Sequence, residues 1–150
     1  MATVREIMTA NVATVPPTMG IKELAEFFVQ RGISGAPVVD EEGALLGVVL
    51  EEGLIIKDSR VHVPTVMNVL FGFVVLGEKR FEDEIQKIAA LTVAGIMDHH
   101  PHVLSPDDTI EDVATHMLDK NIWYYPVAEQ GKLIGVVTKK DLVKAIAKGI

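Results

Sequence analysis

The sequence contains no cysteine. Disulfide bonds, thiolate nucleophiles and sulfur-ligated zinc sites are therefore excluded. Catalytic motifs are missing as well, since we find no Gly-x-Ser-x-Gly elbow, no Gly-x4-Gly-Lys-Ser/Thr phosphate loop, no His-Glu-x-x-His and no Gly-x-Gly-x-x-Gly. The acidic residues are spread along the chain, so the sequence selects no pair of them for acid–base chemistry. We expect a protein that is not an enzyme.

Basic residues and long apolar runs are also scarce. The chain has 14 Lys and Arg against 21 Asp and Glu, and nucleic-acid backbones are held by clustered basic residues, so nucleic acid is not an expected partner. No run approaches the ~18 apolar residues of a membrane span. The first residues lack the apolar core of a secretion signal. The 150 residues are thus expected to form a soluble, cytoplasmic globular domain that has no membrane partner.

The chain contains an internal repeat. Two copies of a unit of roughly 50 residues match in register, which is the signature of a duplicated structural unit. The matching segments are Arg5–Met8 with Ala94–Met97, Pro37–Val39 with Pro126–Ala128, and Leu45–Val49 with Leu133–Val137. One copy alone buries too little apolar surface to be stable. We therefore expect the copies to pack about a pseudo-twofold axis, with a cleft at the seam.

Each copy is predicted to run strand, helix, strand, strand, helix. Apolar residues at helical spacing begin at Ile21 and at Ile110. Ser105–Asp108 has the chemistry of a cap for the second of these helices. Gly32 and Asn121 suit the left-handed residue that ends each helix.

Two hairpins are predicted after these helices. In each, two apolar runs flank a short polar turn that contains glycine. The runs are 36–39 and 45–50 around Asp40–Gly43, and 125–128 and 133–138 around Glu129–Gly131.

The duplicated unit resembles the CBS domain, and the chain is similar to a tandem pair of them, often called a Bateman module. Element order, the apolar-Pro-Val motifs and the segment Leu133–Asp141 carry the resemblance. It implies an α/β (α+β) fold of two pseudo-symmetric repeats, each a small sheet with two helices, packed sheet to sheet. We assign repeat 1 to residues 1–56, an inter-repeat helical segment to 57–93 and repeat 2 to 94–150.

The resemblance also implies a function. Such pairs bind adenosine-containing small molecules in clefts between repeats and usually regulate another protein. The implied ligands are AMP, ADP or ATP, with S-adenosylmethionine as a further option, and no cofactor is required. A disc-like homodimer of modules is implied too, while the regulated protein is not identified. The alternative is a ligand-free dimerisation or protein-docking scaffold.

The segment from Gly135 to Asp141 leaves a strand and enters a helix, so its backbone N–H groups form a natural anion site. Asp141 can accept hydrogen bonds from both cis hydroxyls of a ribose, and Thr138 offers a hydroxyl to sugar or phosphate. Lys139 and Lys140 would attract a phosphate. Thr-x-x-acid is equally a helix capping box. Capping and ligand binding are compatible, and both interpretations stay open.

By resemblance, the adenine slot that faces this motif is closed by residues of both copies. They are Met8, Thr9, Ala13, Ile33, Ser34, Tyr124 and Val136. Ordinary core packing is the competing interpretation for the apolar members of this set. Because side chains alternate along a strand, at most two of the three aromatic residues at 123–125 can line the cleft.

The first copy departs from the motif. Leu50-Glu-Glu-Gly53 stands where the second copy has Thr138-Lys-Lys-Asp141. No ribose-binding carboxylate remains there, and Glu51 and Glu52 would repel a phosphate. We predict one nucleotide-competent site per chain.

Two further segments each have two interpretations. His99, His100 and His102 form a local cluster, for which solvent-facing loop histidines are favoured over a metal site. Residues 61–76 are strongly apolar, and a helical stripe follows within 81–89. This segment would either cover the module's own sheet or form a subunit interface.

Overall fold

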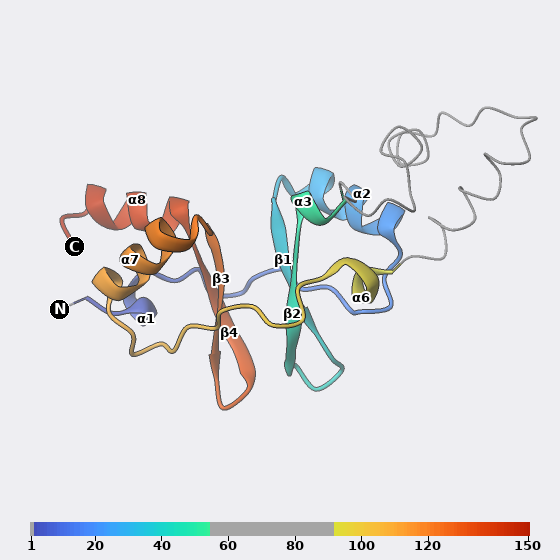
Figure 1. The fold of residues 1–150 in the computed structure, drawn as a ribbon, viewed down its shortest axis with the longest axis horizontal. Helices are drawn as coiled ribbons and strands as arrows, with labels where there is room; N and C mark the ends of the chain where they lie inside the picture. The colour runs from blue at the N-terminus through green and yellow to red at the C-terminus, as the bar shows by residue number, and fades with distance from the viewer. Residues whose placement is uncertain (1, 55–91) are drawn as a thin grey trace, which may run out of the picture.

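The computed structural model describes residues 2–54 and 92–150. Nearly all of the predicted inter-repeat segment, including the apolar run 61–76 and the stripe 81–89, lies outside these residues. Two antiparallel hairpins face each other at the centre, and the helices lie on their outer sides (Figure 1). The predicted arrangement of two repeats with two small sheets is confirmed. No helix in the described part of the chain is long and apolar enough to cross a membrane.

The first copy contributes three helices and one hairpin, and the second copy does the same. In chain order the elements are α1 (Val4–Ile7), α2 (Ile21–Arg31), β1 (Gly35–Val39), β2 (Leu45–Leu50), α3 (Glu51–Leu54), α6 (Val93–Ile96), α7 (Ile110–Lys120), β3 (Tyr124–Glu129), β4 (Lys132–Thr138) and α8 (Lys139–Ala147).

The long helices α2 and α7 end as the sequence predicts. Gly32 and Asn121 adopt the left-handed conformation, with φ of 61° and 55°. The predicted start of α7 was wrong. Thr109 caps it, because its side chain accepts a hydrogen bond from the backbone N–H of Asp112 at 3.2 Å.

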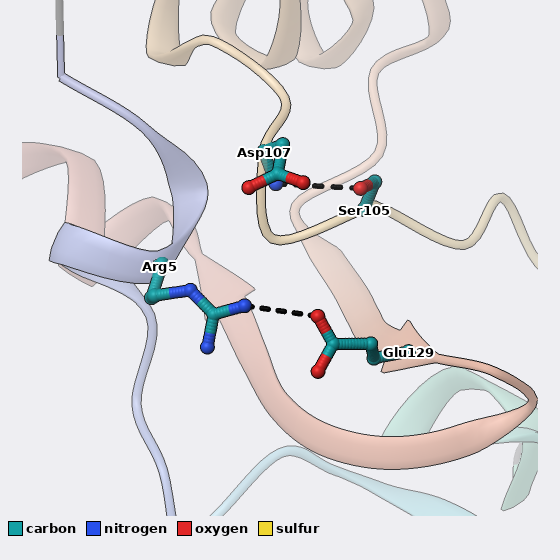
Figure 2. A network of polar contacts seen from close by, with 4 residues as sticks. All are labelled: Arg5, Ser105, Asp107 and Glu129. Atoms are coloured by element: carbon teal, nitrogen blue, oxygen red, sulfur yellow. Dashed lines mark hydrogen bonds and ion pairs between the residues drawn. The ribbon is translucent and has the colours of Figure 1, made fainter.

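Ser105–Asp108 instead forms a turn ahead of the cap. The backbone N–H of Ser105 donates to Oδ2 of Asp108 at 2.9 Å. Figure 2 shows the contact of Asp107 with Ser105, whose Oγ accepts the Asp107 N–H at 3.3 Å.

Both hairpins form with the predicted glycine turns. β1 pairs with β2 and β3 with β4, each antiparallel. Gly43 and Gly131 hold positive φ in the two turns. The hairpins also meet each other reciprocally, since Leu45 N–H donates to the Gly131 carbonyl and Leu133 N–H to the Gly43 carbonyl. This reciprocity is the expected pseudo-twofold relation.

The strand predicted at the start of each copy was wrong. These segments begin with the four-residue helices α1 and α6 and then pair only at isolated points, such as Val15 with Val38 and Leu104 with Val127. Pro17 and Pro106 stand two residues after these points, where the next backbone donor of each ladder would lie. Because proline has no N–H to donate, neither ladder can continue.

The leading segments are exchanged between the copies. α1 packs in the core of the second copy, where Val4 joins Leu104 and Tyr125, and α6 packs in the core of the first, where Val93 joins Leu24. Figure 1 shows α1 beside α7 rather than beside α2. The two cores are therefore interlocked, because each is completed by the other copy's leading segment.

An exposed ion pair adds to this attachment. Arg5 of α1 reaches Glu129 at the end of β3, with 3.0 Å between the charged groups (Figure 2). Exposed pairs contribute little to stability, typically below ~1 kcal/mol. The buried contacts of Val4 are thus the main attachment of α1.

Each exchanged segment crosses a strand at a glycine. Thr9 and Val136 exchange two backbone hydrogen bonds of 2.9 and 3.0 Å. A Cβ at Gly135 would lie 2.8 Å from the Thr9 carbonyl oxygen. Gly47 stands in the same relation to the Asp98 carbonyl. Glycine is needed at both crossings because the backbones approach too closely for a side chain.

Candidate functional site

A cleft of about 1190 Å³ lies at the seam and draws its walls from both copies. One set of lining residues comes from the first copy and its leading segment, namely Thr9, Val12, Ala13, Phe28, Val29, Gly32, Ile33, Ser34, Gly35, Leu50, Glu51 and Glu52. The other set comes from the second copy, namely Asn121, Ile122, Trp123, Tyr124, Val136, Thr138, Lys139 and Lys140. A volume of this order suits a drug-sized or nucleotide-sized ligand.

Nine of the twelve residues predicted for the site line this cleft. They are Thr9, Ala13, Ile33, Ser34, Tyr124, Val136, Thr138, Lys139 and Lys140. Met8, Gly135 and Asp141 do not line it. Met8 packs against the core of the second copy, and its sulfur closes over Gly135.

Asp141 is buried directly behind two lining residues and is only 5% exposed. Its Oδ2 accepts hydrogen bonds from the backbone N–H of Thr138 at 2.8 Å and from the Thr138 hydroxyl at 3.2 Å. Its Oδ1 accepts the hydroxyl of Thr9 at 2.8 Å. The capping box is therefore present at the start of α8. The same carboxylate also joins the leading segment of one copy to the helix of the other.

Tyr124 lies where the two hairpins touch. A Cβ at Gly35 would be 3.0 Å from its ring, so the glycine makes room for the aromatic side chain. The Tyr124 hydroxyl is buried and has no hydrogen-bond partner among the described residues. Burial, and secondarily the negative charge of Asp141, raises the pKa of Tyr124. A buried hydroxyl without a partner is available to a bound ligand.

Of the three consecutive aromatic residues, Trp123 and Tyr124 line the cleft, whereas Tyr125 is buried in the core of the second copy. The ammonium group of Lys139 lies 5.0 Å from the centre of the Trp123 ring. This is a cation–π distance. Trp123, the only tryptophan in the chain, is thus in contact with a cationic side chain of the cleft.

The prediction missed several lining residues, and the repeat itself contains a signal that would have found some of them. Ile122 is the counterpart of Ile33, and Asn121 is the counterpart of Gly32. Applying the repeat offset to the predicted residues would have added Gly35, Leu50, Glu51, Glu52, Ile122 and Trp123. The offset is not sufficient alone, because Asp98, the counterpart of Thr9, does not line the cleft.

The histidine cluster divides in the structure. His102 stacks on His116 with 3.9 Å between ring centres, and Nδ1 of His116 lies 2.7 Å from the Tyr125 hydroxyl. Nε2 of His99 instead approaches the Ala94 carbonyl at 3.0 Å. Within residues 2–54 and 92–150, no three potential ligand side chains gather as a metal site would require.

Comparison with known proteins identifies the fold. The family model described as "CBS domain" matches residues 4–59 and 93–148. This chain belongs to the CBS domain family. The interlocked halves described above are thus a CBS pair.

Individual relatives agree with this assignment. The CBS pair is 32% identical to the chloroplastic CBS domain-containing protein CBSX1 of Arabidopsis thaliana, over 95% of this chain and 63% of the relative. CBSX2 of the same plant is 31% identical with the same coverage. The chain therefore spans about 63% of the length of these relatives.

Solved structures are similar as well. The crystal structure of CBSX2 in complex with AMP superposes with a TM-score of 0.75 at 25% identity, covering 99% of this chain and 98% of the other. The CBS domain of a membrane protein from Sphaerobacter thermophilus gives a TM-score of 0.72 at 25% identity, covering 96% of this chain and 87% of the other.

Proposed function

We propose that this CBS pair is a regulatory module that binds one adenine nucleotide per chain in the seam cleft. The observation that carries the proposal is the position of Thr138, Lys139 and Lys140 in the wall of a nucleotide-sized cleft, with Asp141 directly behind them. The complex of the related CBSX2 with AMP supports an adenosine-containing ligand. AMP, ADP and ATP are the leading candidates, and S-adenosylmethionine is a further one.

The polar groups of this wall match the parts of a nucleotide. Oδ1 of Asp141 accepts one protein hydrogen bond, from Thr9, and a carboxylate oxygen can accept two. Oδ1 can therefore accept a ribose hydroxyl as well, and this hydroxyl has to reach past the lining residues Thr9 and Thr138 because Asp141 itself lies behind them. The phosphate would meet the N-terminus of α8 and the ammonium groups of Lys139 and Lys140. Ala13, Ile33 and Val136 offer apolar contacts for the base.

Two features support one ligand per chain. Trp123 and Tyr124 stand at the positions equivalent to Ser34 and Gly35, so bulky side chains replace small ones on the other side of the pseudo-twofold. Glu51 and Glu52 replace Lys139 and Lys140 there. Steric bulk and charge both disfavour a second nucleotide.

We infer that the module forms a homodimer. Val29 of α2 and Leu118 of α7 occupy equivalent positions of the two copies and are 82% and 73% exposed. On α8, Ile146 is 76% exposed. Exposed apolar side chains at pseudo-symmetric positions suit a self-complementary interface with a second copy.

The alternative is a scaffold that dimerises or docks on a protein without a small ligand. It is favoured by the hydrogen bonds that already hold both oxygens of Asp141 within the chain. In either case the module is proposed to regulate or assemble rather than to catalyse. A cytoplasmic location stays a prediction, and the relatives CBSX1 and CBSX2 are named as chloroplastic.

The test titrates AMP and its 2′,3′-dideoxy analogue into the wild type and Asp141→Asn, by calorimetry and by the fluorescence of Trp123. In the wild type, loss of both hydroxyls should weaken binding about 10- to 100-fold, as expected for hydrogen bonds to a charged group. In Asp141→Asn, AMP should bind about as weakly as its analogue. Each comparison is made within one protein, so a change in folding stability does not imitate the result.

Asp107→Asn is the matched control, because Asp107 is exposed in the turn before α7. It should preserve the full difference between the two ligands. If AMP, ADP, ATP and S-adenosylmethionine give neither heat nor a fluorescence change at millimolar concentration, the nucleotide proposal is rejected in favour of the scaffold.

A further inference from the structure

Four of the side chains that line the cleft are charged, and they form two pairs of opposite sign. Glu51 and Glu52 begin α3, while Lys139 and Lys140 begin α8. Each pair directly follows its hairpin. The two pairs therefore occupy equivalent positions about the pseudo-twofold.

Backbone contacts fix where each pair begins. The N–H of Glu51 donates to the Ser34 carbonyl at 2.9 Å, and the N–H of Lys139 donates to the Trp123 carbonyl at 3.3 Å. Gly35 and Tyr124, the residues after these two carbonyls, touch each other at the seam. The carboxylates and the ammonium groups thus share one opening, with one charge sign on each side.

The lysine side matches a single phosphate. A phosphate monoester carries a charge of about −1.5 to −2 at neutral pH, which two ammonium groups can balance. Each further phosphate adds negative charge, and the described lining offers no third cation. The charged side chains that remain are Glu51 and Glu52. All four charged side chains line the same cleft, and charges within one cleft are screened less by salt than charges on separate surfaces.

We propose that Glu51 and Glu52 make the cleft select adenine nucleotides by phosphate number, with AMP preferred over ADP and ADP over ATP. This inference rests on the proposed function, because it assumes that an adenine nucleotide binds at α8. It assigns specificity to two residues that lie outside the Thr-x-x-Asp motif. Their contribution is repulsion of the wrong ligand.

The experiment measures dissociation constants of adenosine, AMP, ADP and ATP with EDTA present, for the wild type and for Glu51→Gln/Glu52→Gln. The wild type should bind AMP about 10-fold more tightly than ATP. The double variant should bind ATP about 3- to 10-fold more tightly than the wild type does, and AMP should change by less than about 2-fold. These sizes correspond to partly screened charges in water.

Glu41→Gln/Glu42→Gln is the matched control. These adjacent glutamates of the β1–β2 turn are exposed and outside the cleft lining. The control removes the same net charge, so it should leave the ratio of ATP to AMP affinity unchanged. Raising the salt concentration should bring the dissociation constants of ATP and AMP closer together in the wild type and in the control. The same change should be much smaller in Glu51→Gln/Glu52→Gln, because this variant lacks the two carboxylates whose repulsion the salt would screen.

Adenosine separates the two proposals. If adenosine and AMP bind but the ATP to AMP ratio is the same in Glu51→Gln/Glu52→Gln as in the wild type, the selection by phosphate number is wrong and the nucleotide module stands. An equal change of this ratio in the Glu41→Gln/Glu42→Gln control would reject a local role of Glu51 and Glu52. If neither adenosine nor any nucleotide binds, the proposed function fails, and the selection fails with it.

Discussion

Asp141 illustrates how far a short motif can be interpreted at the scale of single residues. Thr-x-x-Asp predicts a capping box from local geometry alone, and the structure contains one. The hydrogen bond from Thr9 could not be predicted in the same way, because its donor is 132 residues away in the chain. Spacing identifies local partners, whereas a partner from the other copy depends on how the halves pack.

His116 shows the same limit. By sequence it is isolated, yet in the structure its ring stacks on that of His102 and lies in hydrogen-bond contact with Tyr125. Burial lowers the pKa of His116, with smaller contributions from the charges of His102 and Lys120, and Asp119 opposes the shift. The neutral imidazole is therefore favoured in the folded state.

This shift predicts a loss of stability in mild acid. The unfolded chain takes up the His116 proton near its ordinary pKa of 6.5, whereas the folded chain takes it up only at lower pH. The free energy of unfolding should therefore fall as the pH drops below 6.5, until the folded form is protonated as well. Denaturant unfolding of the wild type and of His116→Gln from pH 7.5 to 5.5 measures the effect.

His116→Gln keeps a polar group beside Tyr125 but does not titrate, so its stability should depend less steeply on pH. His100→Gln, which removes an exposed histidine, should retain the wild-type slope. Equal slopes in the wild type and His116→Gln would show that the His116 ring contributes nothing to the pH dependence.

At the scale of elements, apolar periodicity predicted α2, α7 and both hairpins, because each of these patterns is decided within a few residues. It did not predict the exchange of α1 and α6. An apolar residue such as Val4 indicates that a segment is buried, but periodicity does not say in which copy. The glycines at the crossings are the local sign of the exchange, since Gly47 and Gly135 lie at equivalent places in strands that otherwise favour branched side chains.

The crossing at Gly135 predicts a destabilised variant. In Gly135→Ala the new Cβ would lie 2.8 Å from the Thr9 carbonyl oxygen and 2.9 Å from the Met8 sulfur. The backbone carbonyl cannot move without breaking the bridge to Val136. We expect a loss of about 1–3 kcal/mol in the free energy of unfolding, as for other overpacked sites, measured by urea titration.

Gly53→Ala is the control for this substitution. In α3 its Cβ would meet nothing closer than 3.4 Å, and alanine favours helix. Its stability should stay at or slightly above that of the wild type. If Gly135→Ala were as stable as Gly53→Ala, the two backbones at this crossing would have room for a side chain.

At the scale of the whole molecule, the boundaries of the two sequence repeats do not coincide with the boundaries of the two hydrophobic cores. The repeat boundaries at 56 and 94 mark the two copies in the sequence. Each hydrophobic core, however, contains the leading segment of the other copy. The halves therefore cannot separate without exposing both cores. A ligand in the seam would act on one interlocked body, so its effect on a regulated partner should pass through the outer surface of the helices.

That outer surface gives the prediction for assembly. If Leu118 and Ile146 are covered by a second copy, replacing both with glutamate would bury charges in an apolar interface, which is strongly unfavourable. Leu118→Glu/Ile146→Glu should therefore be monomeric under conditions in which the wild type forms the proposed dimer, as measured by native mass spectrometry and sedimentation. Neither residue lines the cleft, so the monomer should still bind AMP. Val103→Glu, at an apolar residue that is 42% exposed in a loop, should leave the dimer intact. A double variant that stays dimeric would place the interface elsewhere, and one that loses AMP binding together with the dimer would tie the cleft to assembly.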